Sequence, residues 1–375
     1  MTMNILITGG LGFIGSHLAT ALILQGHSVT LLDALSAQIH GDIPQPFVPA
    51  GATVVRLDVR DLADRVDLVD GKDVVYHLAA ETGTAQSMYQ MRHYVDVNEG
   101  GTAALLEAIA RCQRRPLRVV LASSRSVYGE GAYRRSGNRR GVVLPAPRTR
   151  AQLASGRWEH VGEDGEALRP IPTAESLLPA PGSVYAATKA AQEMLLASAS
   201  DALGVNSTIL RFQNVYGEGQ SLRNPYTGII SIFFNRARQG LEIPVYEDGL
   251  ESRDFVHVDD VVRALMRVVE TDLQSGVVVN VGSGVPTSVL NLSRTLLTAA
   301  GFEVPVRVTG QYRVGDIRHC YADLDRLERL LGLRPEISLE VGMRRFCAWA
   351  SMQPVHADQL DAATEELRSK GLSNR

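Results

Sequence analysis

The chain has 375 residues, of which 45% are hydrophobic and 21% charged, and its formal net charge at pH 7 is −3. These values are typical of soluble globular proteins, and the length favours a main domain with a smaller second one. The weak charge excludes a broad basic surface, so nucleic acid is not an expected partner. We also expect no membrane association and a cytoplasmic location, because neither a membrane-spanning apolar run nor a signal-peptide pattern occurs.

The first half of the chain alternates short apolar runs with amphipathic segments, a pattern typical of a parallel sheet flanked by helices. Strands are predicted at residues 4–8, 28–33, 53–58, 73–80 and 117–124, and helices at residues 16–25 and 97–112. The pattern therefore predicts an α/β fold with a doubly wound parallel sheet. Ligands of such sheets bind at the carboxyl ends of the strands.

Residues 131–182 interrupt this pattern, since they are rich in Gly, Pro and Arg and show little periodicity. We expect an irregular insertion there. A helix at 185–203 and strands at 206–212 and 277–284 then continue the sheet.

These boundaries predict three parts besides the insertion. A main domain is expected at residues 1–214 plus 256–284, and a smaller mixed α/β lobe that binds the substrate at residues 215–255 plus 285–350. Residues 351–375 are expected to form a C-terminal tail, whose part after about residue 356 is a polar helix or a frayed end. The lobe is expected over the carboxyl ends of the main sheet.

The cysteines Cys112, Cys320 and Cys347 lie far apart and show no paired spacing. They are interpreted as free thiols, with no disulfide and no metal site.

A glycine-rich turn, TGGLGFIG at residues 8–15, connects the first predicted strand to the first helix. In such a turn, backbone N–H groups and the positive end of the helix bind the pyrophosphate of a dinucleotide. The glycines fit two patterns, one through Gly10 and one through Gly9. Cofactor contacts are expected from Gly9, Gly12, Phe13, Ile14 and Gly15.

Asp33 ends the second predicted strand, where a carboxylate can accept hydrogen bonds from the ribose hydroxyls of a dinucleotide. The same carboxylate would repel a 2′-phosphate, and no arginine follows it directly. The residues therefore predict a Rossmann domain that binds NAD in preference to NADP.

Two further strand ends are expected beside the cofactor. Asp58 could bind the adenine amino group, with the Val59 backbone beside it, or cap the helix that follows, and the sequence leaves both interpretations open. Leu78, Ala79 and Ala80 end the fourth strand, where small side chains let a cofactor lie against the backbone.

The segment VYAATKAAQE places Tyr185 and Lys189 four residues apart, hence on one face of a helix. Using a phenolate as a base at neutral pH costs about 4 kcal/mol, which a nearby Lys⁺ and a positive nicotinamide ring can offset. Ser123 and Ser124 end the fifth strand, where a hydroxyl can bind a reacting oxygen. Alone, either serine would be interpreted as a turn cap.

In this order, the glycine turn, the serines and the Tyr185–Lys189 pair resemble the extended short-chain dehydrogenase/reductase family, specifically its nucleotide-sugar epimerases and dehydratases. The resemblance extends from Ile5 to about Trp349, apart from the insertion. It implies catalytic roles for Ser124, for Tyr185 as acid/base, and for Lys189 as electrostatic partner and ribose ligand. It also implies that Asn98 lies near the nicotinamide.

The serine, tyrosine and lysine also favour the glycine pattern that runs through Gly9. On this interpretation Gly10 only provides spacing. We therefore expect Gly10→Ala to be tolerated better than Gly12→Ala or Gly15→Ala.

The second half of the chain adds segments that resemble the substrate site of the same family. LRFQNVYGEGQ (210–220) implies that Asn214 contacts the diphosphate, and SRDFVHVDDVV (252–262) implies the same for Arg253. YRVGDIRH (312–319) offers Arg313 as a second phosphate ligand and Asp316 as a ribose or arginine partner. Guanidinium groups bind phosphate oxygens in a bidentate manner.

Arg125 and Ser126 stand where the family's 4,6-dehydratases carry Asp-Glu, which disfavours that reaction. The insertion and the segment SLRNPYTGI (221–229) resemble the dTDP-L-rhamnose 4-epimerases, some of which carry cysteine pairs in the insertion. This chain carries none there, so no metal is expected.

The resemblance implies an NAD-dependent nucleotide-sugar 4-epimerase, an isomerase of carbohydrate biosynthesis that acts by transient oxidation at carbon 4. Its expected substrates are dTDP-L-rhamnose and dTDP-6-deoxy-L-talose, or a UDP-hexose. A 4-ketoreductase and a dehydratase of the family stay open, as does a non-catalytic dinucleotide-sensing protein, against which the Tyr185–Lys189 pair argues. The family further implies a homodimer through the helices near 95–110 and 185–203.

Overall fold

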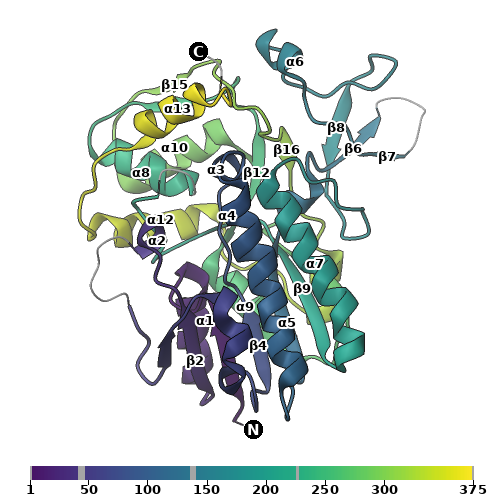
Figure 1. Cartoon of the computed structure of the whole chain (residues 1–375). Helices are drawn as coiled ribbons and strands as arrows, with labels where there is room; N and C mark the ends of the chain where they lie inside the picture. Colours follow the sequence, from purple (N-terminus) through teal and green to yellow (C-terminus); the bar gives the residue numbers. More distant parts are fainter. Residues whose placement is uncertain (1, 41–46, 136–140, 225–227, 374–375) are drawn as a thin grey trace.

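A seven-stranded parallel sheet forms the centre of the computed structural model, which describes residues 2–40, 47–135, 141–224 and 228–373 (Figure 1). The strands stand in the order β13-β9-β5-β4-β1-β2-β3. Their bounds are β1 Asn4–Thr8, β2 Ser28–Asp33, β3 Thr53–Arg56, β4 Val74–His77, β5 Arg118–Ser124, β9 Asn206–Phe212 and β13 Val277–Val281. Every pairing in the sheet is parallel, so the predicted fold class is confirmed.

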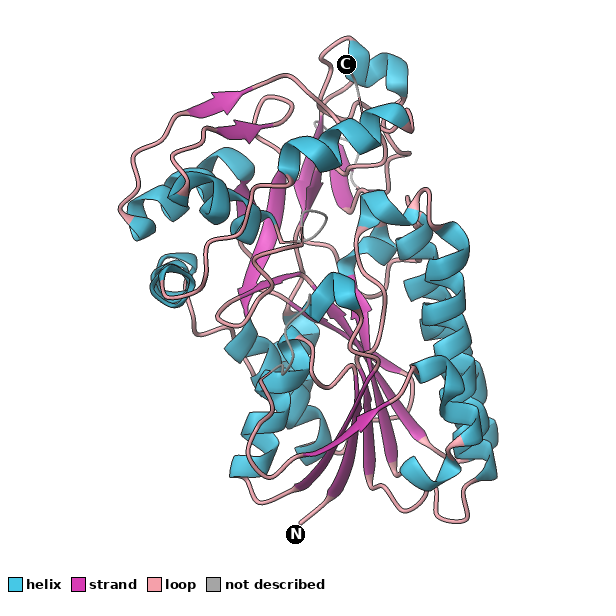
Figure 2. Cartoon of the chain, turned by 60° about the vertical axis from the view of Figure 1, so that its left-hand side comes forward, coloured by secondary structure: helices cyan, strands magenta, loops and turns pink. Residues whose placement is uncertain are grey.

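Helices cover both faces of this sheet, as the apolar strands require (Figure 2). The core of one face is closed by α1 (Phe13–Leu24) and α9 (Val258–Glu270), and that of the other by α5 (Gly101–Arg111) and α7 (Val184–Leu203). Helix α11 (Asp325–Leu331) also joins the first core, through Leu327 and Leu331. The main domain therefore takes a segment that the predicted boundaries gave to the lobe.

The remaining helical segments of the main domain are short. They comprise α2 Ala37–His40, η1 Val59–Asp64, η2 Val66–Leu68, α3 Thr84–Ser87, α4 Met91–Val95, η3 Asp96–Gly100 and η4 Arg125–Tyr128. No helix within the described residues is long and apolar enough to cross a membrane. Cys112, Cys320 and Cys347 are buried free thiols, as expected.

The second lobe lies beyond the carboxyl ends of the main strands (Figure 2). One of its sheets joins β10 (Asn214–Tyr216), β12 (Ser252–His257), β14 (Pro286–Ser288) and β16 (His319–Cys320), and another pairs β11 (Ile243–Val245) with β15 (Val306–Val308). The helices are α8 Ile229–Arg238, α10 Val289–Ala300 and α12 Leu339–Ser351. They pack around buried aromatic side chains that include Phe234 and Phe346.

The insertion is more regular than the sequence predicts. It contains an antiparallel sheet of β6 (Ala132–Arg135), β7 (Val142–Val143) and β8 (Leu168–Ile171). Helix α6 (Arg150–Ala154) lies between β7 and β8 in the chain and stands at the outer end of the insertion in Figure 1. The sequence did not reveal these strands because they have two to four residues each, too few to show periodicity among Pro and Gly.

The C-terminal segment forms a helix, one of its two expected alternatives, but the helix has a buried apolar face. Helix α13 (Leu360–Ser369) packs against the lobe and buries Leu360, Ala363 and Leu367. The carboxylate of Asp358, just before the helix, pairs with the buried guanidinium of Arg236 on α8. These apolar positions repeat at helical spacing, so the amphipathic pattern is present among many charged residues.

Candidate active site

A cleft of about 950 Å³ lies between the carboxyl ends of the main strands and the lobe. Of the residues predicted to bind or react, it brings together all but two. The main domain contributes Gly9, Gly12, Phe13, Ile14, Gly15, Asp33, Asp58, Val59, Leu78, Ala79, Ala80, Ser124 and Tyr185, and the lobe contributes Asn214, Arg253, Arg313 and Asp316. Asn98 and Lys189 do not line the cleft surface; both are buried behind it.

The glycine turn is shaped by close backbone contacts. Gly9 has a φ of +66°, and a Cβ there would lie 2.8 Å from the nitrogen of Ala79. A Cβ on Gly15 would lie 2.4 Å from the carbonyl oxygen of Gly9. A Cβ on Gly12 would meet only that same oxygen, at 3.2 Å. The absence of a side chain at Gly12 is therefore not needed for the packing of the turn. It keeps the backbone accessible from the cleft.

Gly10 is closely packed against the strands β1 and β2. A Cβ on Gly10 would lie 2.9 Å from the carbonyl oxygen of Ile7 and 2.9 Å from the side chain of Leu31. The expectation that Gly10 only provides spacing is therefore wrong, because the residue touches the buried ends of two strands.

Asp33 ends β2 with its carboxylate at the cleft. It accepts hydrogen bonds from the N–H of Leu11 at 3.0 Å and of Leu35 at 2.9 Å, and His40 Nε2 lies 3.5 Å away. Burial alone would raise the pKa of Asp33, but the contacts with His40 and the two N–H groups lower it overall. His40, which lines the cleft beside this carboxylate, was missed because a lone histidine after a strand carries no pattern.

Asp58 caps the start of the short helix η1, which is one of the two roles that the sequence left open. Its carboxylate accepts hydrogen bonds from the Arg60 backbone N–H and Nε, both at 2.9 Å, and from a terminal nitrogen of Arg60 at 2.7 Å. Both carboxylate oxygens are therefore already bonded at the start of η1.

Asn98 holds the loop after β4. Its Oδ1 accepts from the N–H of Glu81 at 2.7 Å, and its Nδ2 donates to the Glu81 carbonyl at 3.1 Å and to Thr188 at 2.9 Å. The amide is thereby committed within the protein, and it fixes one wall of the cleft against α7.

Ser124 and Tyr185 meet across the cleft floor. Helix α7 begins just before Tyr185 because the Ser183 hydroxyl caps it, accepting from the N–H of Ala186 at 3.2 Å. Ser124 Oγ accepts hydrogen bonds from the N–H and hydroxyl of Ser126, at 3.2 and 2.9 Å. Burial raises the pKa of Tyr185, while the hydrogen bond with Ser124 and the charge of Arg125 act in the opposite direction.

Lys189 is buried one helical turn below Tyr185. Burial lowers the pKa of Lys189 to about 7, although the carboxylate of Glu193 acts to raise it. That carboxylate is shared, because Arg211 donates to both of its oxygens at 2.9 and 2.7 Å and Ser123 donates to one. Ser123 therefore faces the interior, and Ser124, the next residue of the strand, faces the cleft.

The lobe side of the cleft is rich in guanidinium groups. Arg313 stacks over the ring of Tyr246, with 4.8 Å from its central carbon to the ring centre. Both terminal nitrogens of Arg253 donate to backbone carbonyls, those of Ser252, Ile317 and Arg318. Arg125, which the sequence analysis treated only as a departure from the dehydratases, donates to Asn214 Oδ1 at 3.2 Å.

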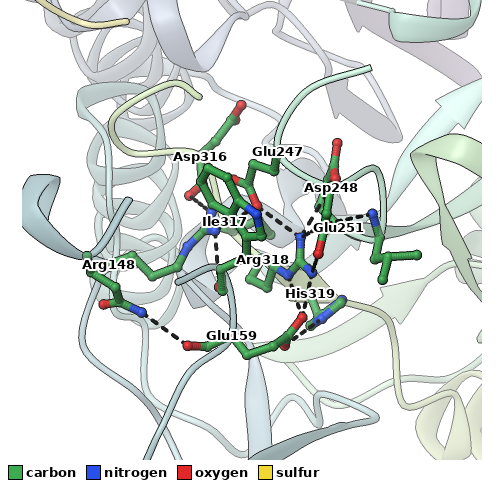
Figure 3. Close-up of polar contacts among 12 residues, drawn as sticks. Arg148, Glu159, Glu247, Asp248, Glu251, Asp316, Ile317, Arg318 and His319 are labelled. Carbon is green, nitrogen blue, oxygen red and sulfur yellow. Dashed lines mark hydrogen bonds and ion pairs between the residues drawn. The ribbon is translucent and has the colours of Figure 1, made fainter. Parts of the chain in front are cut away.

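An ion network centred on Arg318 joins the insertion to the lobe (Figure 3). This fully buried guanidinium contacts Glu247 at 2.9 Å and Asp248 at 2.7 and 2.9 Å. The insertion contributes Glu159, which binds Arg318 Nε at 2.8 Å, and Arg148, which binds Glu247 at 2.8 Å. Because Glu247 lines the cleft, the insertion helps to fix the position of the cleft wall.

The same network accounts for the close approach of three acidic side chains, because Arg318 lies between them. Glu247, Asp248 and Glu251 lie close enough together to hold a metal ion, but Arg318 already stands among them. Burial raises the pKa of Glu251 to about 7.

The main-domain end of the cleft fits a dinucleotide. The glycine turn leaves open the space that a Cβ would fill, Asp33 presents a carboxylate at the end of β2, and Ala79 and Ala80 leave the β4 end uncovered. These features suit a pyrophosphate, a ribose and a flat ring, respectively. Among the described residues that line the cleft, no arginine contacts Asp33, in keeping with NAD.

Comparison with protein families agrees with this geometry. The model described as "NAD dependent epimerase/dehydratase family" matches residues 5–149 and 158–282. The chain belongs to this family. The matched segments contain the glycine turn, Ser124, Tyr185 and the lobe residues Asn214 and Arg253.

Individual members of the family are similar over nearly the whole chain. A dTDP-L-rhamnose 4-epimerase from Burkholderia thailandensis is 38% identical over 354 residues, covering 93% of this chain and 95% of the relative. The structure of UDP-glucose 4-epimerase from Thermotoga maritima, with UDP-glucose, has a TM-score of 0.75 and 29% identity, covering 92% and 98% of the two chains. That of UDP-glucuronic acid 4-epimerase from Bacillus cereus, with UDP-glucuronic acid and NAD, has a TM-score of 0.72 and 26% identity, covering 93% and 99%.

Proposed function

We propose that this member of the family is an NAD-dependent nucleotide-sugar 4-epimerase, which inverts carbon 4 of a hexose through a 4-keto intermediate. The proposal rests on one observation. Ser124 and Tyr185 of the main domain line the same cleft as Asn214 and Arg313 of the lobe. Similarity to the Burkholderia relative supports dTDP-L-rhamnose and dTDP-6-deoxy-L-talose as the substrate pair, with UDP-hexoses as the second choice.

Gly9, Gly12, Gly15 and Asp33 would hold NAD, which when bound supplies both the acceptor and the donor for the hydrogen on carbon 4. Tyr185 takes the proton of the carbon 4 hydroxyl and later returns it to the same oxygen. Ser124 assists because its oxygen already accepts from Ser126, which leaves its own hydrogen free to donate. Lys189, behind Tyr185, contributes positive charge when protonated.

Inversion requires that the two faces of carbon 4 are turned, one after the other, toward the group that removes and returns its hydrogen. Lobe residues anchor the nucleotide and its diphosphate, while the hexose beyond the diphosphate turns within the cleft. Guanidinium and amide donors suit this anchoring, since charge-assisted hydrogen bonds to phosphate are strong and leave the sugar free.

The test uses the protein as purified, with no cofactor added. We expect mass spectrometry to find bound NAD, and NMR to show inversion at carbon 4 of dTDP-L-rhamnose without net change in the absorbance of reduced nicotinamide. Stoichiometric oxidation of added NADH by a 4-keto sugar would establish a ketoreductase instead. Release of water with an unsaturated product would establish a dehydratase.

Tyr185→Phe tests the catalytic assignment. Loss of the proton-transfer group is expected to reduce kcat by roughly 10²–10⁴-fold. Tyr321→Phe, outside the cleft, is the matched control. Unchanged activity in Tyr185→Phe would remove Tyr185 from the reaction.

We further propose a homodimer formed through α4, α5 and α7. Met194 and Leu195 on α7 are 63% and 37% exposed, and Met91 and Val95 on α4 are 52% and 39% exposed. An apolar group of this kind on adjacent helices suits burial against a second copy. Light scattering is expected to give twice the chain mass, and Met194→Glu the mass of one chain. The cytoplasmic location expected from the sequence stays a prediction as well.

A further inference from the structure

Arg125 is a cation in the cleft wall whose hydrogen-bonding capacity is largely unused. It follows Ser124 at the carboxyl end of β5, and its Nε donates to Asn214 Oδ1 at 3.2 Å. Within the part of the chain that the structure describes, Asn214 is its one hydrogen-bond acceptor, and no carboxylate forms an ion pair with it. Both terminal nitrogens therefore keep their donors for a ligand.

Other arginines in the interior of this protein are paired. They bind carboxylates or carbonyls as follows: Arg211 to Glu193 at 2.7 Å, Arg148 to Glu247 at 2.8 Å, Arg318 to Asp248 at 2.7 Å and Arg253 to the Ile317 carbonyl at 2.7 Å. A charge withdrawn from water without a counter-charge is costly. Arg125 is partly exposed in the cleft wall and, like Arg313, has no carboxylate within ion-pair distance among the described residues, so both guanidinium groups are available to a bound anion.

The neighbours of Arg125 indicate which anion. Burial and the charge of Arg253 lower the pKa of Arg125, and the more distant carboxylate of Asp316 offsets this only in part, so two guanidinium groups repel each other in this wall. An anion with more than one negative charge relieves that repulsion. Arg125 also acts electrostatically on Tyr185, so it lies at the end of the cleft where the sugar reacts.

Arg125 also orients Asn214. Because Asn214 Oδ1 accepts from the guanidinium, the Nδ2 donors of the amide are the ones left for a ligand. Arg125 and Asn214 thus present N–H groups, and no acceptor, from the same part of the wall.

We propose that Arg125 is a phosphate ligand of the substrate, and that with Asn214 it binds the phosphate next to the hexose. This assignment rests on the proposed function, which places a nucleoside diphosphate sugar in the cleft. It gives Arg125 the role that the family resemblance implies for Arg253, whose terminal nitrogens already donate to carbonyls. The anchor about which the hexose turns then lies one residue from Ser124.

Calorimetric titration of the holoenzyme tests this without turnover. The probes are dTDP and dTMP, or UDP and UMP if the wild type prefers uracil. Arg125→Met is expected to weaken binding of the diphosphate by roughly tenfold to hundredfold, the value of charge-assisted hydrogen bonds. Binding of the monophosphate, which lacks the second phosphate, is expected to change by less than about threefold.

Two further variants distinguish a direct effect of the Arg125 charge on the phosphate from an indirect effect through the orientation of Asn214. Arg125→Lys keeps the charge and is expected to retain part of the diphosphate affinity, whereas Arg125→Gln can still donate to Asn214 but is expected to behave like Arg125→Met. Near wild-type affinity in Arg125→Gln, or equal weakening of both nucleotides, would show a positioning role and overturn the assignment. Retained NAD and an unchanged Tm establish that each variant is folded.

The outcomes also distinguish this inference from the proposed function. If the wild type binds the diphosphate in an Arg125-dependent manner but inverts no sugar, only the epimerase proposal fails. If it inverts a sugar and Arg125→Met binds the diphosphate normally, only the Arg125 assignment fails. A wild type that binds neither nucleotide overturns both.

Discussion

The hydroxyl of Tyr246 lies 3.2 Å from the hydroxyl of Thr364, so helix α13 contacts the same tyrosine over which Arg313 stacks. Leu360 of this helix lines the cleft, and Ala363 is buried against the lobe. Helix α13 is therefore part of the cleft wall on the lobe side, where we propose that the nucleotide binds.

Detaching α13 is expected to weaken nucleotide binding. Ala363→Glu forces a carboxylate into a contact that is 5% exposed, so we expect roughly tenfold weaker binding of a nucleoside diphosphate by calorimetry. Bound NAD, held by the glycine turn, should be retained. Ala362→Glu adds the same charge on the exposed face of the helix and serves as control. Equal effects of the two substitutions would show that charge, and not the contact, matters.

Replacing Arg318, the centre of the ion network, is expected to lower the stability of the folded protein. Arg318→Met leaves the half-buried Asp248 without its cation and the buried Glu247 with Arg148 alone, and we expect a loss of about 3–5 kcal/mol in the free energy of unfolding by urea titration. The exposed pair Arg334–Glu328 is the control, since Arg334→Met removes an ion pair that water already screens and should leave the free energy of unfolding nearly unchanged. Similar losses in both variants would contradict the special role of the network.

Stability should depend on pH through Lys189. Its pKa of about 7 in the folded protein lies below the ordinary value of 10.5, so between these values the unfolded chain binds more protons and stability rises with pH. Lys189→Met removes this dependence. In protein freed of nucleotide, the variant should exceed the wild type in stability at pH 7, and the excess should shrink by roughly 2–3 kcal/mol by about pH 9. An excess that stays constant with pH would rule out a buried, titrating lysine.

The glycines of the turn should separate folding from cofactor binding. Gly10→Ala and Gly15→Ala place a Cβ against backbone atoms at 2.9 and 2.4 Å, so both should lower Tm. Gly12→Ala meets one atom at 3.2 Å, so it should fold with nearly unchanged Tm and yet lose bound NAD, as measured by mass spectrometry. A Gly12→Ala protein that retains NAD would show that the cofactor does not approach this backbone.

The main sheet could be predicted because its strands are short segments rich in apolar residues that alternate with helical segments. The insertion sheet could not, since β7 has two residues and no local pattern reveals its pairing with β6. The helix at the C-terminal end was one of two alternatives left open by the sequence, whereas its burial depends on distant groups such as Arg236, which no local pattern reveals.

At the site, residues within motifs were brought together as predicted, notably Ser124 and Tyr185. Residues defined by their partners were not predictable. Asp58 is occupied by Arg60 and Asn98 by Glu81, and neither pairing follows from spacing. Arg125 was visible in the sequence only as a missing dehydratase acid, whereas its contact with Asn214 and its lack of an ion pair among the described residues appear only in three dimensions.

The insertion has a mechanical consequence. It follows η4 in the chain and ends just before α7, which carries Tyr185, yet two of its ion pairs, Arg148–Glu247 and Glu159–Arg318, are made with the lobe. A rotation of the lobe that widened the cleft would therefore pull on the segment that connects Ser124 to Tyr185. The end of α13 is tied to the same insertion, because Arg150 donates to the carbonyl of Gly371, so opening the cleft on either side acts on the spacing of these two side chains.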